Sequence, residues 1–166
     1  KGLDVLVNAA KLLGWKAVIY AVGGSAEDFK KATDLEPPPN LICVGEKPYG
    51  DMPLWLCVAD VFLVLGTKKN EYSYLHTSPM KLFEYMASRH PIVAGRTPAN
   101  LEIIKENEAI FYEPDSSVDL ADKIQYVLES KNNFTEMIDK AYSKVEQFSW
   151  KNRAEAVLKF IESMAT

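Results

Sequence analysis

The sequence contains little cysteine. Two of its 166 residues are cysteines, too few for a disulfide framework, so a reducing environment is expected. Cys43 lies within an apolar, strand-like run, and Cys57 lies on the apolar face of a predicted helix. Both are therefore expected to be core residues rather than reactive thiols.

The sequence also has no excess of basic charge and no long hydrophobic run. Nineteen lysines and arginines stand against 23 aspartates and glutamates, so the chain lacks the positive field that nucleic-acid binding requires. The longest apolar stretch, Trp55–Leu65, is interrupted by Asp60 and is shorter than the about 20 apolar residues of a membrane span. We therefore expect no nucleic-acid partner, no transmembrane segment and a cytoplasmic protein that reaches a membrane surface only through another domain.

Three patterns that carry chemistry are missing. The two histidines, His76 and His90, have no cysteine, aspartate or glutamate at metal-ligand spacing, so no metal is expected. No Ser-His-Asp arrangement can be assigned from the chain. The glycine pattern of a dinucleotide-binding turn follows none of the predicted strands.

Short apolar runs alternate with helical patterns along the chain. A helix is predicted from Leu3 to Leu13, where apolar residues recur with the helical period and Gly14 supplies a stop. This alternation predicts an α/β fold, a Rossmann-like doubly wound parallel sheet with helices on both faces. Strands are predicted at 17–22, 41–44, 61–65, 91–94 and 109–112, further helices at 25–31, 52–59, 78–88, 99–106, 118–130, 135–148 and 151–164, and a long loop at 66–77.

The loops at the carboxyl ends of the predicted strands begin with glycine. They start at Gly23, Gly45, Gly66 and Gly95. Glycine lets the backbone turn sharply and lets a ligand approach the main chain. Ligands of doubly wound sheets bind at this edge, so it is the predicted site.

One helix start at this edge suits an anion. Ser78 and Pro79 predict an N-cap followed by proline at the first helical position, with free amides and a partial positive charge. Lys81 opposes the helix dipole unless an anion binds there; otherwise it is a solvated lysine whose stem covers apolar surface. Glu84, on the same helix, can accept hydrogen bonds from the vicinal hydroxyls of a ribose, although periodicity alone favours an exposed helical glutamate.

Several segments occur in an order and at intervals that resemble a known family. They are KGLDVLV at 1–7, VGE at 44–46, ADVFL at 59–63, SPMKLFEYMASRHPIVA at 78–94 and FSW at 148–150. Together they resemble the C-terminal, donor-binding domain of a GT-B glycosyltransferase of the retaining group 1 (glycogen-synthase-like) family. The resemblance covers essentially the whole chain, and the block at 78–94 is its most specific part.

The resemblance implies roles for residues of the predicted anion site. Glu84 matches the second glutamate of the family's paired-glutamate motif and is expected to bind the ribose hydroxyls. Lys1 matches the lysine that reaches the donor diphosphate together with an upstream arginine, which this chain does not contain. The amides at the start of the Ser78 helix, flanked by Thr77 and Lys81, are expected to hold phosphate oxygens.

The resemblance extends to two further segments. Gly45, Glu46 and Lys47 match the loop whose backbone faces the nucleobase. Glu102 matches an acidic position after the fourth strand. All four belong to the predicted donor-binding set.

The chain departs from the family at one position of the paired-glutamate motif. The first glutamate of the pair should lie eight positions before Glu84, where this chain has His76. In the family this position contacts the transferred sugar, so His76 and Lys1 are the candidate catalytic residues and the identity of the sugar is open. Glu71 is a stand-in if the loop is longer than usual.

The resemblance implies a domain that binds a nucleotide-diphospho-sugar. With an N-terminal acceptor-binding domain that this chain lacks, it would transfer the sugar with retention of configuration. The sugar nucleotide is the substrate, no cofactor or metal is expected, and the isolated domain is expected to bind nucleotide weakly without transferring sugar. The alternatives are a sugar-nucleotide epimerase of the same architecture, a degenerate domain that only binds, and a flavodoxin-type module.

A domain of this kind begins with a strand that lies centrally in the sheet. Without that strand the sheet would be split and its inner edges left unpaired. We therefore expect the protein to extend upstream of Lys1, or another segment to fill the gap.

Overall fold

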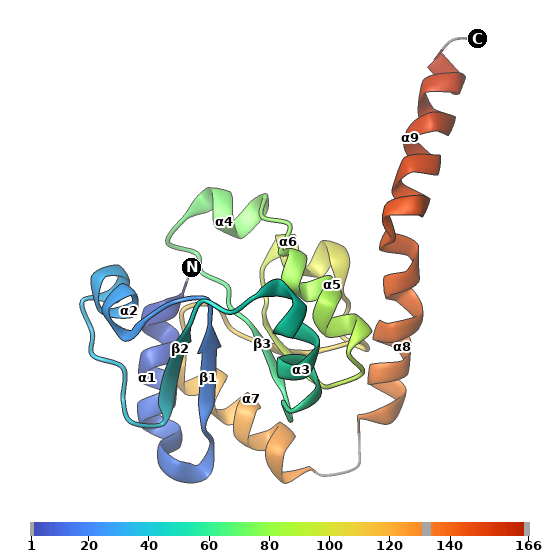
Figure 1. Cartoon of the computed structure of the whole chain (residues 1–166). Helices are drawn as coiled ribbons and strands as arrows, with labels where there is room; N and C mark the ends of the chain where they lie inside the picture. Colours follow the sequence, from blue (N-terminus) through green and yellow to red (C-terminus); the bar gives the residue numbers. More distant parts are fainter. Residues whose placement is uncertain (1, 131–133, 165–166) are drawn as a thin grey trace.

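The computed structural model describes residues 2–130 and 134–164, and it confirms the predicted α/β fold. Helices alternate with parallel strands along the chain and flank the strands (Figure 1). The strands are β1 (Ile19–Val22), β2 (Leu41–Gly45), β3 (Phe62–Val64), β4 (Ile92–Gly95) and β5 (Ile110–Tyr112). The helices are α1 (Leu3–Leu13), α2 (Ala26–Thr33), α3 (Met52–Cys57), α4 (Glu71–Leu75), α5 (Met80–Ala87), α6 (Pro98–Ile103), α7 (Ser117–Glu129), α8 (Thr135–Val145) and α9 (Trp150–Met164), with 3-10 turns at Gly14–Lys16, Tyr49–Asp51 and Glu146–Phe148.

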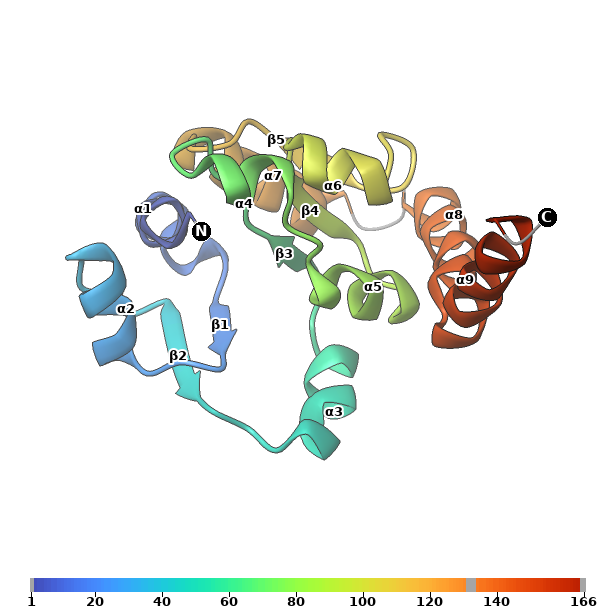
Figure 2. The same ribbon diagram turned by 90° about the horizontal axis from the view of Figure 1, so that it is seen from above.

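The sheet is split into two parts, which confirms the expectation for a chain whose first element is a helix. β1 pairs in parallel with β2, with Ile19 opposite Leu41. β4 lies between β3 and β5 in a second, three-stranded parallel sheet. Within the described residues no strand joins β1 to β3, and Figure 2 shows the two apart.

Two apolar clusters form the core. The first lies around α1 and α7, which pack against each other, and includes the fully buried Val7 and Leu120. It also contains Ile19 of β1 and Val93 of β4, so it joins the two sheets. The second cluster packs α5 and α6 on the three-stranded sheet around the fully buried Leu82. Because buried apolar area is the main stabilising term, these clusters hold the two sheets in one unit.

Local signals place the first two helices where the sequence predicts them. α1 ends at Gly14, which has a positive φ of 53°. Ser25 caps α2: its Oγ accepts a hydrogen bond from Asp28 N (3.2 Å), and the Asp28 carboxylate accepts one from Ser25 N (2.9 Å). This reciprocal capping box satisfies two amides that a helix start leaves open.

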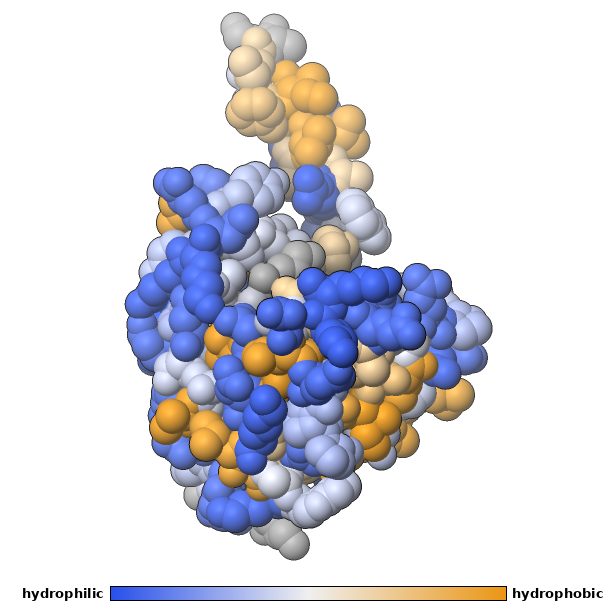
Figure 3. Space-filling model, turned by 90° about the vertical axis from the view of Figure 1, so that its left-hand side faces the viewer, coloured by the Kyte–Doolittle hydropathy of each residue, from blue (hydrophilic) through white to orange (hydrophobic). Residues whose placement is uncertain are grey.

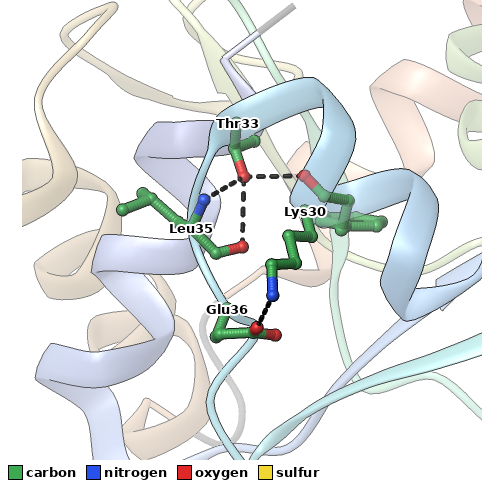
Figure 4. A network of polar contacts seen from close by, with 5 residues as sticks. Lys30, Thr33, Leu35 and Glu36 are labelled. Carbon is green, nitrogen blue, oxygen red and sulfur yellow. Dashed lines mark hydrogen bonds and ion pairs between the residues drawn. The ribbon is translucent and has the colours of Figure 1, made fainter.

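The end of α2 is closed by a small polar network (Figure 4). The Thr33 hydroxyl oxygen accepts a hydrogen bond from Leu35 N (3.2 Å), and Lys30 forms an exposed ion pair with Glu36. Asp34, between them, lies in the left-handed region with φ 58°. Its carboxylate forms no hydrogen bond or ion pair with the described residues, so Asp34 contributes to this turn through its backbone amide, which donates to Lys30 O (2.8 Å), and not through its side chain.

The prediction that both cysteines are core residues is correct for only one of them. Cys43 is half-buried against the first cluster, and burial raises the pKa of its thiol. Cys57 is exposed, so its predicted place in the core is wrong. The apolar face of this segment is formed by Leu56 and Ala59, and Cys57 falls outside it.

One predicted helix is shorter than expected. The 99–106 helix spans Pro98–Ile103, and it is capped by Thr97, whose hydroxyl accepts a hydrogen bond from Asn100 N (3.2 Å). It stops because Ile104 is extended, with φ −125° and ψ 142°, and fully buried. The packing of one apolar side chain therefore outweighs the helical pattern beyond it.

The last helix, α9, projects from the body of the domain (Figure 1). All its described residues are exposed, and Figure 3 shows apolar side chains gathered on the projecting helix. The large ones are Trp150, Val157, Leu158, Phe160, Ile161 and Met164. None of the helices in the described ranges is both long and apolar enough to cross a membrane.

Candidate functional site

The carboxyl ends of β3 and β4 and the start of α1 converge on three glycines. A Cβ added at Gly66 would lie 2.7 Å from Thr97 Cγ2, and one at Gly95 would lie 2.8 Å from Gly66 Cα. At Gly2, which has φ 77°, it would lie 3.0 Å from the Gly66 carbonyl oxygen. Because only glycine permits this approach, two strand ends and a helix start meet at one point of the edge.

Tyr112, the last residue of β5, bonds to the same point. Its hydroxyl oxygen accepts a hydrogen bond from Gly66 N (3.0 Å), and the side chain is fully buried. Burial raises the pKa of Tyr112 to about 12, so the phenol stays neutral at physiological pH. The Gly66 amide is therefore satisfied by protein rather than left for a ligand.

The residues that follow Gly66 are held by the turn after β5. The Thr67 hydroxyl donates a hydrogen bond to Asp115 Oδ1 (2.6 Å), and Lys68 N donates one to Asp115 Oδ2 (2.8 Å). Lys69 N donates to the Thr67 hydroxyl (3.1 Å), and Lys68 forms an ion pair with Glu113. The amides of Gly66, Lys68 and Lys69 thus already bond to the protein, which makes these three poor candidates for holding a phosphate.

An ion pair joins the same loop to α1. Lys69 Nζ lies 2.6 Å from Asp4 Oδ2, at the first turn of the helix. The hydrogen bond from Lys69 lowers the pKa of the Asp4 carboxyl, and the same bond raises the pKa of Lys69. Asp4 also suits the positive end of the helix dipole. The pair fixes the loop against the start of α1.

The predicted 66–77 loop contains a short helix, α4, that the sequence analysis missed. Asn70 caps it by accepting a hydrogen bond from Ser73 N on its Oδ1 (2.7 Å). Five residues are too few to show a helical period, but Asn70 followed by Glu71 was an available signal for a helix start. None of the residues in α4 is buried, and the helix contacts α6.

His76 is the C-cap of α4. Its backbone amide donates to Tyr72 O (2.9 Å), and its exposed ring has its centroid 5.9 Å from that of Tyr72. Glu71 lies in the first turn of the same helix and is exposed. The two side chains proposed for the motif position therefore lie on one short helix.

α5 begins one residue later than the sequence predicts. It starts at Met80, and its N-cap is Pro79, with ψ 101° and no side-chain cap. The predicted Ser78 cap is therefore wrong: the extended Pro79 delays the first helical turn. Ser78 and Lys81 are exposed, and Thr77 is half-buried beside them. Because no side chain caps this start, its first-turn amides suit an external anion.

Glu84 lies half-buried on α5, next to a firmly packed face. Leu82 is fully buried, and Tyr85 stacks on Phe62 with ring centroids 4.3 Å apart. Burial, and then the charge of Glu84, raise the pKa of Tyr85. The Glu84 carboxylate itself has no hydrogen bond or ion pair within the described ranges, so it can accept hydrogen bonds from an outside hydroxyl.

The predicted base-facing loop lies at the end of the other sheet. Gly45, with φ 70°, accepts a hydrogen bond from Gly23 N (2.9 Å) and donates one to Gly24 O (3.1 Å). Glu46 and Lys47 follow and are exposed. This turn is therefore held to the neighbouring turn by the main chain alone.

The predicted residues form two groups at the edge. One group lies on α4, α5 and the segment between them, and the other follows β2; Figure 1 shows both segments on the upper side of the domain. Glu102 is exposed on α6, and Lys1 lies outside the described residues. Over residues 2–130 and 134–164, no group of three or more histidine, cysteine, aspartate or glutamate side chains is placed to hold a metal ion.

Two shallow hollows contain none of the predicted residues. The first is lined by Lys11, Gly14, Trp15, Pro38, Pro39 and Asn40. The second is lined by Asn107, Glu108, Asp139, Lys140, Ser143, Lys144 and Gln147. Both include segments that precede a strand, at the amino edge, so neither coincides with the predicted site.

Residues 1–144 match the family model described as glycosyl transferases group 1. The match spans most of the chain and includes every predicted site residue. The chain belongs to this family. Membership in group 1 confirms the resemblance at the family level, and it does not favour the epimerase or the flavodoxin-type alternative.

Solved structures share the fold of this group 1 domain. HepE of Anabaena, solved with UDP-glucose, has a TM-score of 0.78 and 18% identity over 98% of this chain and 45% of its own. Sucrose-phosphate synthase of Thermosynechococcus elongatus has a TM-score of 0.74 and 20% identity over 99% of this chain and 42% of its own. The C-terminal domain of the group 1 protein LpcC from Francisella tularensis has a TM-score of 0.65 and 21% identity over 89% of this chain and 78% of its own.

These identities establish the fold alone, which is the Rossmann-like architecture of the C-terminal half of GT-B glycosyltransferases. The chain spans less than half the length of HepE and of the sucrose-phosphate synthase. No curated protein sequence matches it.

The sequence analysis missed the residues that hold the loop after β3. Asp4, Lys69, Tyr112 and Asp115 lie far apart in the chain, and only the fold brings them together. Pro114 before Asp115 is a local turn signal. Nothing local indicates that this carboxylate reaches an amide 47 residues upstream.

Proposed function

We propose that this domain binds a nucleotide-diphospho-sugar at the carboxyl edge of its strands and, with an N-terminal acceptor-binding domain, transfers the sugar with retention of configuration. The observation that carries the proposal is the group 1 family match over residues 1–144. The complex of HepE with UDP-glucose supports a sugar nucleotide as the ligand class.

The diphosphate is assigned to the start of α5. Its first turn has no side-chain cap, while the amides of Gly66 and Lys68 already bond to protein groups. Thr77 and Ser78 lead into this turn and Lys81 lies within it, so hydroxyl groups and positive charge surround the phosphate position. Lys1 is assigned to the same diphosphate through the family resemblance.

The nucleoside is assigned to the rest of the predicted set. Glu84, without a hydrogen bond or ion pair in the described part of the chain, accepts hydrogen bonds from the two ribose hydroxyls. The main chain of Gly45, Glu46 and Lys47 faces the base. Glu102 remains in the binding set through the resemblance alone.

The reaction breaks the bond between the anomeric carbon of the sugar and the terminal phosphate oxygen. Negative charge develops on the departing diphosphate, and the helix amides with Lys1 and Lys81 stabilise it; such preorganised electrostatic stabilisation is the largest catalytic contribution in many enzymes. His76, two residues before Ser78, faces the transferred sugar in this proposal. These groups neutralise the leaving charge, so the proposed reaction needs no metal or cofactor.

Titration calorimetry of the chain with UDP and with GDP tests the proposal. We expect heat with at least one of them, and an affinity about tenfold lower for Glu84→Gln, because a neutral amide accepts hydrogen bonds from the ribose less strongly. Glu27→Gln, on the exposed face of α2, is the matched control and should bind as the unmodified chain does. No heat with either nucleotide, in a sample whose circular dichroism shows a folded α/β domain, would overturn the donor-site assignment.

A further inference from the structure

The turn after β5 contains a residue in an unusual backbone conformation. Asp115 has φ 68°, in the left-handed region that residues other than glycine rarely adopt. Such strain persists where the surrounding contacts over-determine the conformation. The side-chain contacts of Asp115 distinguish it from Asp34, which has the same backbone conformation but no side-chain bond to the described residues.

Both carboxylate oxygens of Asp115 are used, and both point into the loop after β3. Oδ1 accepts from the Thr67 hydroxyl at 2.6 Å, and Oδ2 accepts from Lys68 N at 2.8 Å. Thr67 is only 2% exposed, and its hydroxyl also accepts from Lys69 N at 3.1 Å. We call Thr67, Lys68 and Asp115 the 67–115 clamp.

The 67–115 clamp lies at the entry to α4. Asn70, two residues after the clamped amide, caps α4, and His76 ends it. The helix has no buried residue and so has no core packing of its own to hold it. Its position depends on the loop that enters it and on its contact with α6.

We propose that Asp115 is a positioning residue for the donor site: through the loop after β3 it holds α4, and with it His76, over the sugar end of the bound donor. This rests on the proposed function. The start of α5 follows His76 by a few residues, so a sugar attached to a diphosphate held there lies within reach of α4. The nucleoside end contacts Glu84 on α5, whose position depends on Leu82 and the core rather than on the clamp.

The placement predicts a selective effect on binding. Loss of the clamp weakens binding of a sugar nucleotide more than binding of the free nucleotide diphosphate, because only the sugar meets α4. A general loss of stability would weaken both equally. The ratio of the two affinities therefore separates positioning from stability.

The chain offers a matched pair of variants for this test. Asp115→Gly removes the carboxylate, and glycine adopts the left-handed conformation without steric strain. The entropy that glycine adds to the unfolded chain is the same in the Asp34→Gly control. Asp34→Gly makes the same change at φ 58°, where the carboxylate bonds to none of the described residues. Asp115→Asn keeps one acceptor oxygen and should restore part of the effect.

The measurements are calorimetric affinities for UDP and for UDP-glucose, and hydrogen exchange of amides 68–76. For Asp115→Gly we expect about tenfold weaker binding of UDP-glucose with less than about a twofold change for UDP. We also expect about tenfold faster exchange across 68–76. Asp34→Gly should change neither measurement.

The outcomes separate the two proposals. An unchanged affinity ratio, or unchanged exchange, in Asp115→Gly overturns the positioning role even if the chain binds both ligands. If the unmodified chain binds neither ligand and gives no heat with GDP, the donor-site assignment is overturned, and the exchange result alone then decides whether Asp115 holds α4.

Discussion

The two-stranded and the three-stranded sheet both end on glycines, but the surroundings of those glycines differ. Gly23, directly after β1, and Gly45, the last residue of β2, have φ of 107° and 70° and nothing within 4 Å of an added Cβ. Gly66, just beyond β3, and Gly95, the last residue of β4, do not have positive φ, yet an added Cβ would lie under 3.0 Å from neighbouring atoms. The first pair is required by the backbone conformation and the second by close packing.

The difference shows how the two halves of the edge are built. At the three-stranded sheet, side chains of Tyr112 and Asp115 bond to the turn after β3. At the two-stranded sheet, Gly23 and Gly24 after β1 bond to Gly45 of β2 through the main chain. A ligand that spans both halves would therefore meet a turn held by side chains at the three-stranded sheet and a sterically open turn at the two-stranded sheet.

Gly95→Ala should have the largest effect on stability of the substitutions that compare the two sheets. The added methyl would overlap Gly66 in the packed edge, so we expect the free energy of unfolding to fall by about 3 kcal/mol. Urea unfolding measures this. Gly24→Ala is the control, because its nearest neighbour, Asp28 Cβ, would be 3.9 Å away and its φ is not positive; it should change stability by no more than about 0.5 kcal/mol. If Gly95→Ala and Gly24→Ala lowered the free energy of unfolding equally, close packing would not be the reason for glycine at position 95.

Tyr112→Phe should have the next largest effect, and the effect should depend on pH. At pH 7 it leaves the buried Gly66 amide without its acceptor, which costs about 1 to 2 kcal/mol. The unfolded tyrosine ionises near pH 10, whereas the folded pKa is raised to about 12. The folded state therefore retains the proton longer, and its extra stability is complete below pH 10 and is lost as pH rises to 12.

Urea unfolding of both proteins at pH 7 and pH 11 measures this dependence. At pH 11 the difference between the unmodified chain and Tyr112→Phe should shrink by about 1.4 kcal/mol. Comparison with the phenylalanine variant removes the contribution of the other tyrosines. A difference that stays constant between the two pH values would contradict the buried, neutral phenol.

Gly45→Ala should have the smallest of these effects. No atom lies within 4 Å of the added methyl, so only the left-handed backbone conformation disfavours alanine. We expect the free energy of unfolding to fall by about 1 kcal/mol. Gly45→Asn should cost less, because asparagine tolerates this conformation. The same unfolding measurement applies. A cost for Gly45→Ala as large as that for Gly95→Ala would mean that the two sheets do not end on glycine for different reasons.

The sequence predicts what depends on near neighbours. Gly14 ends α1 and Ser25 caps α2, because each signal acts within a few residues. The start of α5 was misplaced because the extended backbone of Pro79 outweighs the capping preference of Ser78. Cys57 was misplaced because a one-position difference on a short helix decides whether it packs or is exposed.

Contacts between distant segments were beyond the sequence analysis. Asp34 and Asp115 have the same left-handed backbone, and only the folded chain shows that the Asp115 carboxylate is bonded while the Asp34 carboxylate bonds to none of the described residues. The split sheet was expected because the family resemblance, rather than any local pattern, supplies the position of the central strand. The residue pattern predicts a binding edge, and the tertiary structure shows which of its amides are already bonded to the protein.

A crystal structure of the chain with UDP tests the central claim most directly. The account predicts phosphate oxygens within hydrogen-bonding distance of the first-turn amides of α5, with the ribose hydroxyls on Glu84. Ordered nucleotide bound at the amino edge of the strands, or bound at the carboxyl edge with its phosphates on the 66–69 loop instead of α5, would contradict it.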